Sequence, residues 1–97
     1  MLRQMATAKP DDPFPKYGLA MELRKRGDNE EARTAFEQLV TAHPDYVAAY
    51  LMFGGLLVEL GDKTRAVEIY ARGIEVATRC GNSHAAGELD AALNALQ

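Results

Sequence analysis

The sequence feature that most constrains the fold is an internal repeat with a period of 34 residues. At this offset Leu23 aligns with Leu57, and Gly27-Asp28 aligns with Gly61-Asp62. The other aligned positions are Leu19 with Phe53, Ala20 with Gly54, Ala32 with Ala66, Phe36 with Tyr70, Pro10-Asp11 with Pro44-Asp45, and Leu2 and Met5 with Phe36 and Leu39. A fixed period of this length indicates small structural units that stack on one another.

The segment Tyr46–Val58 is thirteen residues long and has no charged side chain. A helix this apolar must be covered on most sides. Because a helix needs about twenty residues to cross a hydrocarbon layer, the cover must be protein, and we expect no membrane insertion. Tyr50, Phe53, Gly54 and Leu57 recur at helical spacing, which predicts one packing face.

Glycine and aspartate mark the expected helix boundaries. Gly27 and Gly61 suit the left-handed conformation that ends a helix. Asp28 and Asp62 can then cap the following helix, and Asp28 with Glu31 has the pattern of a capping box. The sequence therefore predicts about six helices, at about 2–8, 13–26, 29–42, 46–60, 63–79 and 83–96.

The length of 97 residues is typical of one domain. We divide it into an N-terminal half-repeat helix and turn (1–12), a first repeat (13–46), a second repeat (47–80) and a C-terminal capping helix (81–97). A stack of helix pairs needs end helices to cover its last apolar faces.

Composition argues against several classes of function. Acidic and basic residues are interleaved at a net charge of -3, so no basic stripe for nucleic acid is expected. His43, His84 and the single Cys80 are not spaced like metal ligands or catalytic pairs, so we predict no enzyme, cofactor or metal. One cysteine and no signal-peptide core favour a cytoplasmic protein.

These motifs resemble the tetratricopeptide repeat (TPR) family. The resemblance rests on Leu19, Ala20, Leu23, Gly27, Ala32, Phe36 and Pro44 in the first unit, and on Tyr50, Phe53, Gly54, Leu57, Gly61, Ala66 and Tyr70 in the second. Lys16, Gly73 and Thr78 depart from the family pattern. The resemblance implies an all-α fold, in which antiparallel helix pairs stack as a short right-handed superhelix, an α-solenoid. It also implies a concave groove, lined by the first helix of each unit, that holds a peptide or a partner's helix.

When the groove positions of the family are carried over to this sequence, the resemblance implies a groove lined by Tyr17, Met21, Arg24, Leu51, Gly55, Val58, Glu59, Ala85, Leu89 and Ala92. Arg24 and Glu59 would lie at its rim. Some members of the family bind the C-terminal carboxylate of chaperones through basic and amide side chains. The matching positions here are Tyr17, Met21, Met52, Asn82 and Ala86, so we expect no chaperone-tail receptor.

Two functions remain open at this point. The first is a non-enzymatic adaptor or scaffold, whose apolar groove binds a helix or peptide of another protein. The alternative is a self-associating structural protein, a homodimer or stacked oligomer that uses the same apolar strip or an end helix. Whether the last helix folds inward and covers the strip is also left open.

Overall fold

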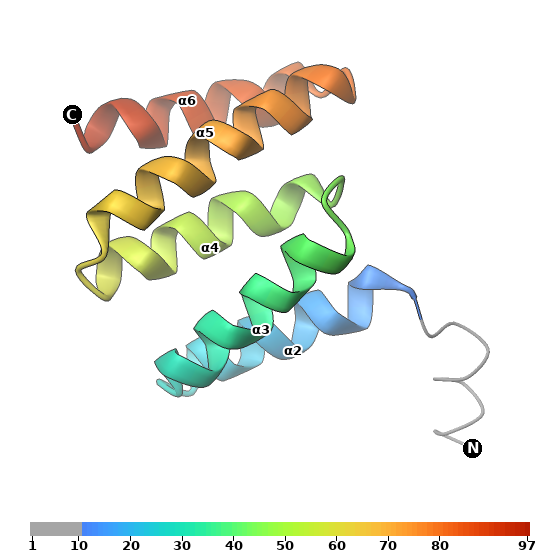
Figure 1. Ribbon diagram of the computed structural model, residues 1–97, viewed down its shortest axis with the longest axis vertical. Helices are drawn as coiled ribbons and strands as arrows, with labels where there is room; N and C mark the ends of the chain where they lie inside the picture. Colours follow the sequence, from blue (N-terminus) through green and yellow to red (C-terminus); the bar gives the residue numbers. More distant parts are fainter. Residues whose placement is uncertain (1–10) are drawn as a thin grey trace.

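A computed structural model describes residues 11–97 of the chain (Figure 1). Within this range the chain forms five helices and no strand: α2 (Pro13–Lys25), α3 (Asn29–Ala42), α4 (Val47–Glu59), α5 (Lys63–Arg79) and α6 (Ser83–Ala95). Their boundaries agree with the predicted ones to within one residue. The helix predicted at about 2–8 lies outside the described residues.

The helices form a stack in which each packs against the next one in sequence. α2 packs on α3, α4 on α5, and α5 on α6, while α3 joins the two repeats by packing on α4 (Figure 1). Neighbours along the chain run antiparallel (Figure 1). α4 also contacts α2 and α6, so these three helices lie on one side of the stack. The predicted all-α architecture of stacked helix pairs is confirmed.

The turns use the predicted glycines. Gly27 and Gly61 have φ of 84° and 83°, in the left-handed region that favours glycine. After the second turn, Asp62 caps α5 because its Oδ1 accepts a hydrogen bond from the Arg65 backbone N–H at 3.1 Å. The capping box predicted at Asp28 is not formed: its carboxylate makes no cap hydrogen bond and instead lies 3.5 Å from Arg26 Nη2.

One apolar core runs through the stack. At the junction of the repeats, the rings of Phe36 (α3) and Phe53 (α4) stack with centroids 5.5 Å apart, and both side chains are fully buried. The other large buried side chains are Leu39, Val40, Tyr50, Leu56, Leu57, Ile69 and Leu89. The face of α4 predicted from Tyr50, Phe53, Gly54 and Leu57 is therefore the packed face.

Two glycines inside helices allow this packing. A β-carbon at Gly54 would lie 2.6 Å from Cδ1 of Tyr70, closer than real β-carbons approach. At Gly73, a β-carbon would lie 2.7 Å from Cβ of Tyr50 and 3.1 Å from Leu89. The glycine at position 73, which departs from the usual alanine of the family, therefore lets α5 approach α4 closely.

Candidate functional site

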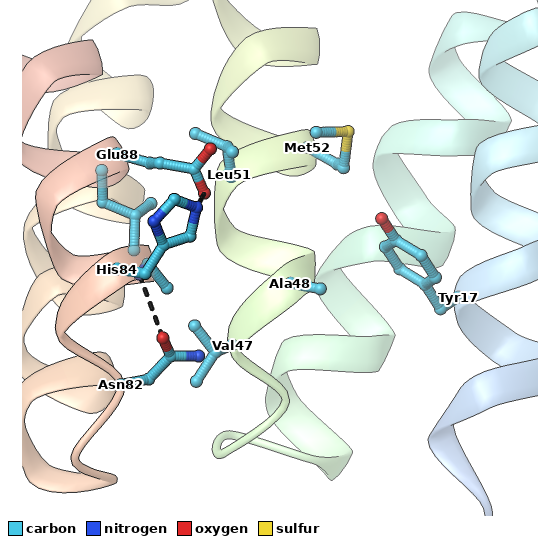
Figure 2. A pocket seen from close by; sticks show the side chains of 10 residues that line it. Tyr17, Val47, Ala48, Leu51, Met52, Asn82, His84 and Glu88 are labelled. Atoms are coloured by element: carbon cyan, nitrogen blue, oxygen red, sulfur yellow. Dashed lines mark hydrogen bonds and ion pairs between the residues drawn. The ribbon is translucent and has the colours of Figure 1, made fainter.

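A groove of about 250 Å³ opens between α2, α4 and α6 (Figure 2). Its walls come from the first helix of each repeat and from the last helix, which is the side of the stack on which the groove was predicted. The residues that line it are Tyr17, Val47, Ala48, Leu51, Met52, Asn82, His84, Ala85, Glu88 and Leu89.

The apolar wall of the groove is one face of α4. Val47, Ala48, Leu51 and Met52 follow helical spacing, and the two larger side chains remain half-buried. In Figure 2, Leu51 points toward α6 and Met52 points toward α2. The opposite face of α4 is the packed face, so this helix divides its apolar residues between the core and the groove.

Tyr17 forms the wall on α2. Its ring lies 5.4 Å from that of Tyr46, at an interplanar angle of 57°. Burial raises the pKa of the Tyr17 hydroxyl above its ordinary value, and the neighbouring Tyr46 adds to this shift. The hydroxyl therefore stays protonated at neutral pH and can both donate and accept a hydrogen bond at the groove.

Polar side chains of α6 form the third wall. His84 and Glu88 are exposed one helical turn apart, with 3.7 Å between Nε2 and Oε1 (Figure 2). Asn82 caps this helix by accepting from the Ala85 backbone N–H at 3.0 Å. Leu89 is 1% exposed and packs toward Gly73. α6 is thus anchored on α5 by a core residue and presents a polar rim to the groove.

Arg24 bridges α2 and α4 beside the groove. Its Nη1 donates to the Met52 carbonyl at 3.1 Å, and its Nη2 donates to Glu59 Oε2 at 3.0 Å. A β-carbon at Gly55 would lie only 3.3 Å from Arg24 Nη2, so this glycine leaves room for the guanidinium against the helix. Arg24 and Glu59, which were predicted to lie at the rim, are therefore paired with each other.

The ten residues predicted for the groove separate into two sets. Tyr17, Leu51, Ala85 and Leu89 line it. Met21, Arg24, Gly55 and Ala92 are half-buried outside the lining, while Val58 and Glu59 are exposed near the end of α4. Because Arg24 lies over Gly55, we place Val58 outside the groove. The residues of α4 that line the groove all lie in the first half of this helix.

Six lining residues were missing from the predicted set. Val47 and Ala48 lie four and three positions before Leu51, and Asn82 and Glu88 lie three positions from Ala85, which is the spacing of side chains on one helical face. Met52 and His84 are each adjacent in sequence to a predicted residue, and adjacency does not indicate a shared face.

The described residues also limit other kinds of site. Among residues 11–97, no cluster of three or more His, Cys, Asp or Glu residues is arranged to hold a metal ion. Over the same range, no helix combines the length and the apolar content needed to cross a membrane.

Comparisons with known proteins identify the same family that the sequence motifs resemble. A family profile described as tetratricopeptide repeat matches residues 17–79. A solution structure of a tetratricopeptide repeat domain protein from Salinibacter ruber is 39% identical, with a TM-score of 0.86, and the match covers 91% of this chain and 89% of that one. A crystal structure of a tetratricopeptide repeat domain protein from the same organism gives 39% identity and a TM-score of 0.82, over 88% and 94% of the two chains.

A curated relative is much longer than this chain. Cellulose synthase operon protein C of Komagataeibacter xylinus is 40% identical over 58 residues, which are 57% of this chain and 4% of that protein. Tetratricopeptide repeat domains are generally non-catalytic modules that bind protein partners. The profile match over most of the chain and the two closely similar structures show that this chain belongs to the tetratricopeptide repeat family.

Proposed function

We propose that this protein is a non-catalytic adaptor that binds a helix or an extended segment of another protein in the groove between α2, α4 and α6. One observation carries the proposal: Leu51 and Met52 are only half-buried and line a hollow of about 250 Å³ that α6 leaves open. Since Leu89 anchors α6 on α5, the last helix forms a wall of the groove and does not cover it.

The lining favours a partner with an apolar anchor. A hollow of this size, with an apolar wall and a polar rim, suits one or two large apolar side chains from an amphipathic segment. Tyr17, Asn82 and His84 at the edges can hydrogen-bond the polar groups beside that anchor. No basic clamp surrounds the groove, because Arg24 already pairs with Glu59, so the proposal does not extend to a chaperone tail.

We place the adaptor in the cytoplasm, since the free thiol of Cys80 is exposed and an oxidising compartment would favour its pairing with another thiol. The alternative of self-association through the groove is retained, because the same apolar wall would suit a second copy.

The test is a selection of peptides from a displayed library of 16-residue sequences against the immobilised full chain. Selected peptides are then titrated by fluorescence anisotropy against the wild type, Leu51→Glu and Ala71→Glu. Ala71 is exposed on α5, away from the groove, and receives the same new charge. We expect Leu51→Glu to weaken binding by about a hundredfold or more, since it buries a charge against the anchor, and Ala71→Glu to change it less than about twofold.

Peptides that bind Leu51→Glu as tightly as the wild type would contradict the groove as the binding site. Circular dichroism of each variant separates loss of binding from loss of fold. If Leu51→Glu unfolds the chain, Leu51 belongs to the core, and both the adaptor and the groove-mediated oligomer lose their site.

A further inference from the structure

One carboxylate stands in the wall of the otherwise uncharged groove. Among the described residues that line it, Glu88 is the one acid, and none is lysine or arginine. The Glu88 side chain is 51% exposed, and in Figure 2 it extends from α6 toward α4. Because Glu88 and Leu51 line the same hollow, a segment that fills this hollow contacts both the apolar wall and the carboxylate.

The charge of Glu88 is only weakly balanced within the chain. Its ion-pair partner is His84, whose Nε2 lies 3.7 Å from Oε1, which is too far for a hydrogen bond. An imidazole is also charged only when it is protonated. The guanidinium beside the groove, that of Arg24, is already paired with Glu59 at 3.0 Å. The carboxylate of Glu88 therefore keeps its capacity to accept hydrogen bonds from a partner.

Filling the hollow changes the surroundings of this carboxylate. A partner segment that covers the groove displaces water from it, and a carboxylate that loses water without gaining a new partner costs free energy. A lysine or arginine side chain of the partner replaces that water with a charge-assisted hydrogen bond. An acidic side chain at the same place is repelled. Two segments with the same apolar anchor are thus distinguished by the charge beside it.

We propose that Glu88 selects partner segments that carry a lysine or arginine on the same face as the apolar anchor. That basic residue lies three or four positions from the anchor in a helical segment, or two positions from it in an extended one. The inference rests on the proposed function, because it describes the partner of the same groove. It assigns to the partner the charge opposite to that of the one lining acid.

The first experiment compares selections from the displayed peptide library on the wild type, Glu88→Lys and Asp90→Lys, each as the full chain. Asp90 is exposed on the same helix outside the groove lining, so its replacement changes the net charge equally. This controls for the general attraction of basic peptides to a chain with a net charge of -3. On the wild type and Asp90→Lys, we expect basic residues beside the anchor to outnumber acidic ones by at least about threefold. On Glu88→Lys we expect the opposite preference.

The second experiment titrates one selected lysine-containing peptide by fluorescence anisotropy. We expect Glu88→Gln to weaken its binding by about three- to tenfold, since the lost ion pair is partly shielded from water, and Asp90→Asn by less than about twofold. Replacing the peptide's lysine by glutamate should weaken binding to the wild type. Glu88→Lys should bind this glutamate peptide more tightly than the wild type does. Circular dichroism checks that each variant is folded.

The outcomes separate this inference from the proposed function. If peptides lose binding to Leu51→Glu but bind Glu88→Gln as tightly as the wild type, the groove is the binding site and Glu88 does not select the partner. If Asp90→Asn weakens binding as much as Glu88→Gln, the preference arises from net charge, which also overturns the inference. Peptides that bind Leu51→Glu as tightly as the wild type would contradict the groove itself, and the role of Glu88 with it.

Discussion

Gly54 and Gly55 are adjacent in the middle of α4, where each glycine costs about 1 kcal/mol of helix stability relative to alanine. Their neighbours explain why both are there. Gly54 faces the ring of Tyr70 from α5, while Gly55 faces the guanidinium of Arg24 from α2. Two consecutive residues therefore allow close approach from two different helices, one in the core and one beside the groove.

Replacing Gly54 by alanine tests this account. Overpacking against Tyr70 costs about 1–3 kcal/mol and outweighs the gain in helix propensity, so we expect Gly54→Ala to lose about 1–2 kcal/mol of unfolding free energy. Gly87→Ala on α6 is the control. It has no neighbour within 4 Å and should gain about 0.5–1 kcal/mol. Urea unfolding followed by circular dichroism measures both, and a fully stable Gly54→Ala would mean that Tyr70 moves aside without cost.

The buried tyrosines predict how stability depends on pH. Burial is the main cause that raises the pKa values of Tyr50 and Tyr70, while in the unfolded chain tyrosine ionises near about 10. Above that pH the unfolded state binds fewer protons than the folded state. The contribution of these tyrosines is therefore complete below pH 10 and is lost as the pH rises further. We expect the urea midpoint to fall between about pH 9.5 and 11.

Tyr50→Phe is the matched variant for this pH series. The Tyr50 hydroxyl donates to the Pro44 carbonyl at 2.6 Å, so the variant should lose about 1 kcal/mol at pH 7. Its stability should then decline less steeply at high pH, because one titrating hydroxyl has been removed. A decline as steep as in the wild type would assign the alkaline loss to other groups.

Sequence alone placed Gly54 on the packing face of α4 and Gly55 in the groove. The structure agrees for Gly54, which lies against the ring of Tyr70. The reason for Gly55 depends on the direction of the Arg24 side chain, which reaches the Met52 carbonyl and Glu59. The conformation of a long side chain depends on contacts across the stack, and the spacing of residues does not contain them.

At the scale of elements, α6 also shows that residue spacing predicts local structure but does not predict contacts across the stack. Glycine and aspartate placed the helix boundaries to within one residue, because these boundaries depend on local backbone conformation. The direction of Leu89 depends on how α6 docks on α5. Leu89 lines the groove as predicted, but its side chain lies almost entirely in the core, against the space left by Gly73. The polar rim of His84 and Glu88 follows from that docking and was missed.

Leu89→Ala tests whether α6 is an integral part of the stack. Because the side chain is 1% exposed, its truncation should leave a cavity and cost about 2–5 kcal/mol. Leu93→Ala, one turn later on the same helix and half-buried, should cost less. Urea unfolding compares the two variants. Equal and small losses would mean that α6 is only loosely attached and could close over the groove.

At the scale of the whole molecule, two apolar surfaces decide whether the protein associates with itself. One is the end face of α2 and α3, where Leu19 is 58% exposed and Leu23 and Ala35 are half-buried. The other is the groove, whose volume of about 250 Å³ accepts a few side chains. A stable homodimer generally buries more than about 1,000 Å² with good complementarity, and a hollow of this size supplies only a small part of that area.

We therefore expect the pure protein to be a monomer of 10.6 kDa in light scattering over a wide range of concentration. Leu51→Glu and Val58→Glu should leave this mass unchanged, because neither side chain would be at an interface. A dimer that dissociates on dilution would contradict this expectation. If Leu51→Glu then gave a monomer, the groove would be the surface used for self-association, and the adaptor function would have to move to another face. If only changes at Leu19 gave a monomer, the end face would be the dimer interface.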